Sequence, residues 1–148
     1  MFCGLGSPAW KCSYYNGSTY TDAPSLNQNH LNAKLLEIND NGDLIMIAGQ
    51  NNLSVELLSY GGDEWEIISQ MNDVHFKNGY YHFTAARLGS KYIYTFGGFA
   101  GAGQGGLKNI YKMDLETYEW SVHGQQLIYP RTGRRFTLFS FYRLFKVT

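Results

Sequence analysis

One glycine-rich stretch has the spacing of a nucleotide-binding motif. Residues 101–106 read GAGQGG, which fits the GxGxxG pattern that cradles a dinucleotide pyrophosphate. That motif needs a helix immediately after it, because the helix N-terminus faces the phosphates. The residues that follow, LKNIYKMDL, have the pattern of a strand instead. We therefore interpret residues 97–106 as an extended loop and expect no bound nucleotide.

The side chains that could ligate a metal are too dispersed to form a site. The histidines show neither HExxH nor another close ligand spacing, and Cys3 and Cys12 have no histidine nearby. No Ser or Cys lies in a recognisable nucleophile motif. We expect no catalytic residue, no metal site and no cofactor. The four histidines are His30, His75, His82 and His123.

Composition favours a β-rich globular protein. Aromatic residues make up 16% of the 148 residues and charged residues only 16%, against roughly 25% charged in an average domain. No stretch approaches the roughly 20 apolar residues of a membrane-spanning helix. Basic and acidic residues number 12 each, so the chain lacks the net positive charge of most nucleic-acid-binding proteins. We expect neither a membrane nor a nucleic acid as a partner.

The chain contains an internal repeat. The segments LIMIAG (44–49) and IYTFGG (93–98) are apolar runs that end in two small residues, and their offset is 49. Three downstream pairs share an offset of 55: Val55 with Ile110, Leu58 with Met113, and Trp65 with Trp120. The extra six residues lie in one connection, 50–54 in the first copy and 99–109 in the second. Because the first copy lacks them, we expect deletion of Ala100–Gly105 to leave the fold intact.

Each copy is predicted to form four short strands joined by tight turns. Asn and Gly in the turns adopt positive φ at little cost, and the second strand of each copy is apolar on both faces, as in a strand buried between sheets. No segment has a sustained helical period. The predicted strands are 33–38, 44–48, 54–58 and 64–68 in the first copy, and 82–88, 91–96, 108–113 and 118–123 in the second.

This pattern resembles the kelch repeat, a unit of about 50 residues. The second copy carries the likeness in Gly97-Gly98, Tyr111, Asp114 and Trp120, and the first copy, a weaker match, in Ala48-Gly49, Leu58, Ser59 and Trp65. The resemblance implies an all-β fold of four-stranded antiparallel blades from a kelch-type β-propeller. Gly49, Gly97 and Gly98 would lie where backbones crowd, and Trp65 and Trp120 would be buried at matching positions between blades.

The chain is short for a closed propeller, which needs about four to eight blades. Tyr14–Tyr20 resembles the end of a blade with Tyr20 at the Trp position, and Arg135-Phe-Thr137 echoes His82-Phe-Thr84. We divide the chain into the tail of a preceding blade (1–29), two blades (30–78 and 79–127) and the start of a further blade (128–148). We favour a fragment of a longer protein over an open arc or a ring completed by other copies.

The C-terminal segment is basic and apolar at once. Residues 131–148 carry five basic and no acidic side chains, which would suit phosphate or an acidic partner. The apolar residues of FTLFSFYRLF favour a strand with its cations facing solvent. Unpaired strand edges of this kind lead us to expect self-association.

The sequence leaves the compartment open. Asn16-Gly-Ser and Asn52-Leu-Ser fit the N-glycosylation pattern, which matters only in a secreted chain. The first dozen residues lack the pattern of a signal peptide. The chain is therefore cytoplasmic, or extracellular if its N-terminus is incomplete, and Cys3 and Cys12 either pair or stay free.

The resemblance implies a non-catalytic scaffold that binds a protein partner through the loops connecting its strands. The alternative is a piece of a propeller enzyme similar to galactose oxidase, or an extracellular glycan-binding propeller. The candidate contact residues are Gln50, Asn51, Asn52, Tyr80, Tyr81, Phe99, Gly101, Gln104 and Lys108.

Overall fold

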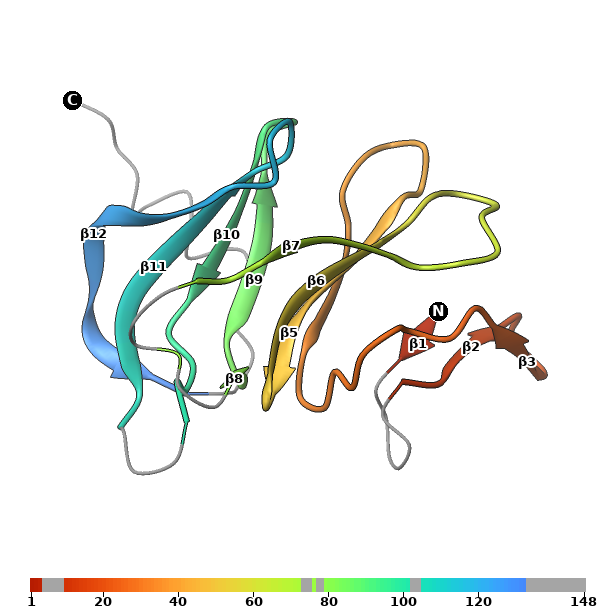
Figure 1. Ribbon diagram of the computed structural model, residues 1–148, viewed down its shortest axis with the longest axis horizontal. Coiled ribbons are helices and arrows are strands. Elements are labelled where there is room, and N and C mark those ends of the chain that lie inside the picture. Colours follow the sequence, from red (N-terminus) through yellow and green to blue (C-terminus); the bar gives the residue numbers. More distant parts are fainter. Residues whose placement is uncertain (4–9, 73–75, 77–78, 102–104, 133–148) are drawn as a thin grey trace.

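The protein is built from β-strands. The computed structural model describes residues 1–3, 10–72, 76, 79–101 and 105–132, and these contain twelve strands in three antiparallel sheets and no helix. Within these residues there is consequently no helix that could cross a membrane. The sheets do not close into a ring or a barrel (Figure 1). Most of the segment predicted to start a further blade, including Arg135-Phe-Thr137, lies outside the described residues.

The strands follow the chain order within each sheet. In the C-terminal and middle sheets, the four main strands each pair with the next along the chain, as in a meander. The N-terminal sheet contains β1 (Phe2–Cys3), β2 (Cys12–Tyr15) and β3 (Tyr20–Ala23). The middle sheet contains β4 (Lys34–Glu37), β5 (Leu44–Gln50), β6 (Asn52–Leu58) and β7 (Glu66–Gln70), and the short β8 (Gly79–Tyr80) pairs with the end of β5. The C-terminal sheet contains β9 (Thr84–Leu88), β10 (Tyr92–Phe96), β11 (Leu107–Asp114) and β12 (Trp120–Arg131).

The eight strands predicted for the two copies are present, with adjusted ends. The largest difference is β12, which continues to Arg131 instead of ending at residue 123, through two irregularities in its pairing with β11. No local signal in the sequence indicates β8, a two-residue strand whose pairing depends on the tertiary contact with β5.

The sheets stack face to face in chain order (Figure 1). In the middle sheet, Met46 and Leu58 face the N-terminal sheet and belong to one core cluster with Cys12 and Trp65. The neighbouring residues Ile45, Ile47 and Val55 point to the opposite face, in a second cluster with Ile93, Tyr111 and Met113 of the C-terminal sheet. Alternation along each strand therefore gives the middle sheet two apolar faces, one for each neighbour.

The C-terminal sheet repeats the middle sheet position by position. Leu44 and Ile93, which the sequence repeat equates, both face the preceding sheet, whereas their neighbours Ile45 and Tyr94 both face away from it. The repeat partners Leu58 and Met113 likewise both face the preceding sheet. The sequence repeat is therefore a repeat of three-dimensional packing.

The small residues that end the second strand of each copy adopt backbone conformations with positive φ. Gly97 and Gly98 have φ of 64° and 91°, and the matching Ala48 and Gly49 have φ of 50° and 147°. A Cβ on Gly98 would lie 2.7 Å from the ring of Tyr80 and 2.8 Å from Cβ of Phe83. A Cβ on Gly49 would lie 3.0 Å from backbone atoms of His30, and one on Gly97 would overlap the carbonyl oxygen of Arg131, so backbone atoms crowd both positions.

Both tryptophans lie where a fourth strand begins and face the preceding sheet. Trp65 is 3% exposed, and its Nε1 donates to the carbonyl of Pro24 at 3.0 Å. Trp120 packs against the core between the middle and C-terminal sheets but is only partly buried. The predicted equivalence is confirmed, with deeper burial for Trp65 than for Trp120.

Two further repeat residues have distinct structural roles. Tyr111 is 2% exposed and belongs to the core between the middle and C-terminal sheets. Asp114 shapes the β11–β12 turn, because its Oδ1 accepts from the amide of Glu116 and its carbonyl accepts from the amide of Tyr118.

The cysteines of the N-terminal sheet are paired. Cys3 and Cys12 form a disulfide between directly opposed residues of β1 and β2. The same cross-strand place is occupied by Ile47 and Val55 in the middle sheet. Tyr20 lies at the start of its strand as predicted, but it is 67% exposed.

We expect Gly98→Ala to destabilise the fold by at least about 2 kcal/mol. The left-handed backbone alone disfavours a Cβ by roughly 1–2 kcal/mol, and the overlap with Tyr80 and Phe83 adds an overpacking cost. Urea unfolding measures the loss. Gly105→Ala is the matched control, because a Cβ there meets nothing within 4 Å, and equal stability of the two variants would contradict the crowding argument.

Candidate functional site

Several chain segments meet at one end of the sheet stack, the lower end in Figure 1, which we call the strap end. Here β8 pairs with Gly49 and Gln50, and Tyr81 bridges to Phe99. The amide of Gly98 donates to the carbonyl of Arg131 at 2.7 Å, so the end of β12 returns to the same place. The strap end thus gathers the β5–β6 turn, the lead into β9 and the β10–β11 connection.

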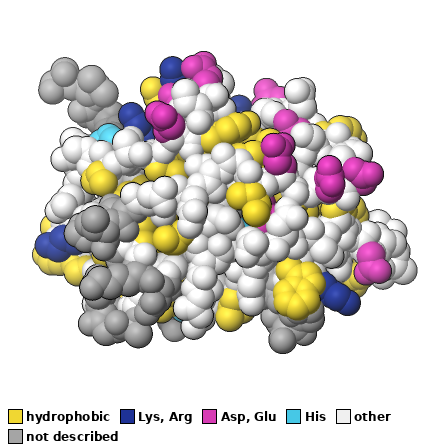
Figure 2. Space-filling view, in the orientation of Figure 1, with side chains coloured by type: hydrophobic (Ala, Val, Ile, Leu, Met, Phe, Trp, Pro, Cys, Tyr) yellow, Lys and Arg dark blue, Asp and Glu magenta, His cyan; other side chains and the backbone are white. Residues whose placement is uncertain are grey.

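Charge distinguishes the two ends of the stack. The turns at the opposite end carry most of the acidic side chains, which gather over the upper part of the face in Figure 2. Among the described residues of the strap end, Lys108 and Arg131 are exposed and no exposed acidic side chain is present. The acidic residues of the opposite end are Glu37, Asp40, Asp43, Asp63, Glu64, Glu66, Asp114, Glu116 and Glu119.

The predicted contact residues converge on the strap end but differ in accessibility. Gln50, Asn51 and Lys108 are exposed. Asn52, Tyr81 and Phe99 are partly buried. Gln104 lies outside the described residues.

Two of the predicted contact residues do not reach the surface. Tyr80 is 0% exposed, because its ring stacks on Phe83 at 4.2 Å and its hydroxyl donates to the carbonyl of Gly97 at 2.7 Å. Gly101 is also buried, at φ 115°. Tyr80 and Gly101 are therefore structural residues.

The start of the β10–β11 connection also belongs to the core. Ala100 is 1% exposed and packs in the cluster between the middle and C-terminal sheets. The amide of Leu107 donates to the carbonyl of Gly98, which closes the base of the connection. Deletion of Ala100–Gly105 would therefore remove the core side chain of Ala100, which argues against the expectation that it leaves the fold intact.

An aromatic cluster marks the surface of the strap end. The rings of Tyr81 and Phe99 stack with centroids 5.9 Å apart, and His82 lies edge-on to both. His82 is exposed and has φ of 54°, and Asn32, at the matching position before β4, has φ of 60°. His82, which lies with Tyr80 and Tyr81 on the stretch between the two copies that is predicted to offer contacts, is therefore an accessible member of this cluster.

A cavity of about 520 Å³ opens beside this cluster. It lies between the N-terminal strand β1 and the segments that lead into β4 and β9. Its mixed lining includes Phe2, Asn32, Lys34, Met46, His82 and Phe83. The strap end therefore offers aromatic, amide and cationic groups within one region.

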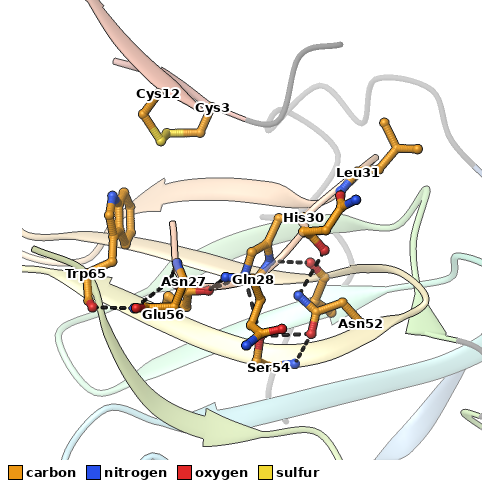
Figure 3. Close-up of polar contacts among 12 residues, drawn as sticks. Cys3, Cys12, Asn27, Gln28, His30, Leu31, Asn52, Ser54, Glu56 and Trp65 are labelled. Atoms are coloured by element: carbon orange, nitrogen blue, oxygen red, sulfur yellow. Dashed lines mark hydrogen bonds and ion pairs between the residues drawn. A yellow bond between two sulfur atoms is a disulfide. The ribbon is translucent and has the colours of Figure 1, made fainter. Parts of the chain in front are cut away.

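A buried histidine–glutamate pair lies beneath this region (Figure 3). His30 and Glu56 are 1% and 0% exposed, and Nε2 of His30 lies 2.8 Å from Oε1 of Glu56. Nδ1 of the same ring lies 2.5 Å from the carbonyl oxygen of Ala48. Both ring nitrogens of His30 therefore face oxygen acceptors, the carbonyl of Ala48 and the carboxylate of Glu56.

Glu56 is held by further donors. The backbone amides of Asn27 and Gln28 donate to its two oxygens at 2.7 and 2.8 Å (Figure 3). Burial alone would raise the pKa of Glu56, but the hydrogen bonds from His30, Asn27 and Gln28 and the histidine charge lower it below the ordinary value. The carboxylate therefore ties the segment before β4 to the middle of β6.

Ser54 lies close to this pair without forming a catalytic triad. Its Oγ is 3.4 Å from Nε2 of His30, the same nitrogen that contacts Glu56. In a serine triad the nucleophile and the acid contact different nitrogens of the ring. Ser54 also donates to Oδ1 of Asn52 and is 8% exposed. Ser54, His30 and Glu56 therefore form a buried structural network of polar contacts.

The C-terminal sheet fills the same place with aromatic rings. Tyr80 lies as far before β9 as His30 lies before β4, and Tyr111 is the repeat partner of Glu56. The hydroxyl of Tyr80 donates to the carbonyl of Gly97, as Nδ1 of His30 does to Ala48. Burial raises the pKa of Tyr80, so its hydroxyl remains a donor.

The described residues contain no group of three or more His, Cys, Asp or Glu side chains that could hold a metal ion.

Comparisons with known proteins add no identification. No protein-family model matches the chain, and no curated protein matches its sequence. Inferences about function therefore depend on the strap end itself.

We expect Glu56→Gln to lower stability at pH 7 by about 3 kcal/mol, because it removes the buried carboxylate that pairs with His30 and accepts from the amides of Asn27 and Gln28. The difference in the free energy of unfolding between wild type and variant should shrink as the pH falls below 4.5, the ordinary pKa of this group. It should go on shrinking as the pH falls through the lower pKa that Glu56 has in the folded chain. Urea unfolding between pH 3 and 7 measures it. Exposed Glu66→Gln is the control, and a gap independent of pH would refute the ionic role.

Proposed function

We propose that this chain is a non-catalytic binding module built from kelch-type blades. The proposal is supported by the matching four-strand order of the middle and C-terminal sheets and by the left-handed small pair that ends both second strands. Trp65 and Trp120 at equivalent places support it further. In this interpretation the sheets are consecutive blades of an incomplete propeller.

The strap end is the surface that binds a protein partner. The observation that carries this proposal is the Tyr81–His82–Phe99 cluster, beside the exposed amides of Gln50 and Asn51. Interface cores are enriched in aromatic side chains and depleted of acidic ones, and the described part of the strap end has both properties. Lys108 and Arg131 at its border favour a partner with acidic groups around an apolar contact.

An extracellular setting with a glycan ligand is the second candidate. Two observations favour it: the Cys3–Cys12 disulfide, typical of oxidising compartments, and the exposed turn position of Asn16 in a glycosylation motif. Aromatic rings next to amides also suit sugars. Asn52 is partly buried, and its Nδ2 donates to the carbonyl of Asn29 on another segment, whereas Nδ2 of Asn16 donates only within its own turn, to Oγ1 of Thr19.

Replacement of both Tyr81 and Phe99 by Ser should abolish partner capture while the chain remains folded, because both residues are partly exposed. Proteins retained by the immobilised wild type, this variant and Tyr60→Ser are compared by quantitative mass spectrometry. Tyr60, 79% exposed at the opposite end, is the matched control. Identical partner sets from all three chains would exclude the strap end, and thermal unfolding verifies folding.

If the chain is directed through a secretory pathway, Asn16 should carry the glycan. The expected mass shift disappears in Asn16→Gln and persists in Asn52→Gln, because Asn16 is exposed in its turn, whereas Asn52 is partly buried. Intact-protein mass spectrometry measures this shift. Secreted, unglycosylated wild type would argue against the extracellular candidate.

A further inference from the structure

The cavity of about 520 Å³ beside the aromatic cluster has the size of a small-molecule site. Pockets for drug-sized ligands occupy roughly 300–1,000 Å³ and combine a mostly apolar wall with a few polar groups. Phe2 of β1, Leu35 of β4 and Met46 of β5 line this cavity, together with Phe83, which directly precedes β9. This part of the wall suits a ligand with an apolar body.

The polar part of the lining donates hydrogen bonds and contains no carboxylate. Lys34 supplies an ammonium group, and Asn32 and His82 supply an amide and an imidazole. Among the described residues no Asp or Glu lines the cavity, and none of the ion pairs found there uses Lys34. The remaining polar side chain, His30, is 1% exposed, and both of its nitrogens already face oxygen acceptors. A cation without an acidic partner, beside two further polar groups, favours an anion.

Two of these polar residues have a backbone conformation that glycine would adopt more easily. Asn32 and His82 have φ of 60° and 54°, and the amide of His82 donates to the carbonyl of Asn32 at 3.4 Å. They occupy matching positions before β4 and β9, so both sheets use this left-handed backbone. Glycine would satisfy it without strain. The chain has side chains there instead, and both line the same cavity, as expected of residues that serve a ligand.

We propose that this cavity binds a small organic carboxylate. The ammonium group of Lys34 pairs with the carboxylate, Asn32 and His82 donate to its oxygens, and the apolar body of the ligand packs on Phe2 and Met46. A single cation matches the charge of a carboxylate better than that of a phosphate ester, which carries nearly two negative charges. This ligand site goes beyond the proposed protein-binding surface and stands whether or not the strap end binds a protein.

Isothermal titration calorimetry of the 148-residue chain with naphthoate tests the proposal. Naphthoate joins a flat apolar body to a carboxylate, and naphthalenemethanol keeps the same body without the charge. Naphthoate should bind, and the alcohol should bind at least about tenfold more weakly, because it lacks the charge-assisted hydrogen bonds. No binding of naphthoate, or equal binding of the two compounds, would overturn the proposal.

Lys34→Gln tests where the carboxylate lies. The variant should bind naphthoate about tenfold more weakly or worse, because it loses the cation of the cavity, and its affinity for the alcohol should not change. Lys11→Gln is the matched control, since Lys11 is exposed and does not line the cavity. Far-ultraviolet circular dichroism verifies that both variants fold. Equal naphthoate affinity of the Lys34 variant and wild type would overturn the proposed site.

Asn32→Gly separates a role in binding from a role in folding. Glycine relieves the left-handed strain, so the unfolding temperature should stay the same or rise. Naphthoate binding should nevertheless weaken by about threefold or more, because the amide is lost. Asn32→Asp keeps the shape of the side chain and should weaken binding further, since it places a carboxylate in the cavity. Wild-type binding by both variants, or a glycine variant much less stable than wild type, would overturn the ligand role of Asn32.

Discussion

The left-handed turn at the end of each second strand is the constraint on which the rest of this protein depends. There Ala48-Gly49 and Gly97-Gly98 open the strand, so that a segment from outside the hairpin can reach its backbone. The amide of Gln50 donates to the carbonyl of Leu31, and that of Phe99 donates to the carbonyl of Tyr81 at 2.9 Å. These bonds fix where the first strand of the same sheet begins, β4 or β9, and thereby position the surface of the strap end.

Two different chemistries fill the space beneath this turn. The middle sheet buries an ionic pair, His30 with Glu56, and the C-terminal sheet buries the rings of Tyr80 and Tyr111. A buried ion pair is not intrinsically more stabilising than an apolar substitute, so stability alone does not decide between them. In both sheets a buried side chain donates to the carbonyl of the first residue of the small pair, Ala48 or Gly97. That hydrogen bond is the feature that the two sheets share.

Much of the fold follows from the sequence. Apolar alternation and the pairs Ala48-Gly49 and Gly97-Gly98 are local signals that specify the strands, their turns and the sheet face on which each side chain lies. The sequence could not specify accessibility where long-range packing decides it. Tyr80 is predicted at the surface, yet the stacked ring of Phe83 buries it. Ala100 is predicted in a dispensable loop, yet it packs into a core whose other members come from distant parts of the chain. His30 precedes β4 and Glu56 lies on β6, and no sequence motif links the two residues.

The disulfide of the N-terminal sheet couples this small hairpin to the redox state of its surroundings. Cys3 and Cys12 occupy a place that the larger sheets fill with apolar pairs, so a covalent link replaces part of their packing energy. Closing a loop of about ten residues restricts the unfolded chain by roughly 3 kcal/mol. Two-electron reduction removes that restriction from the N-terminal hairpin alone and breaks no backbone pairing within the middle and C-terminal sheets. One end of the molecule can thus be loosened chemically without disturbing the other.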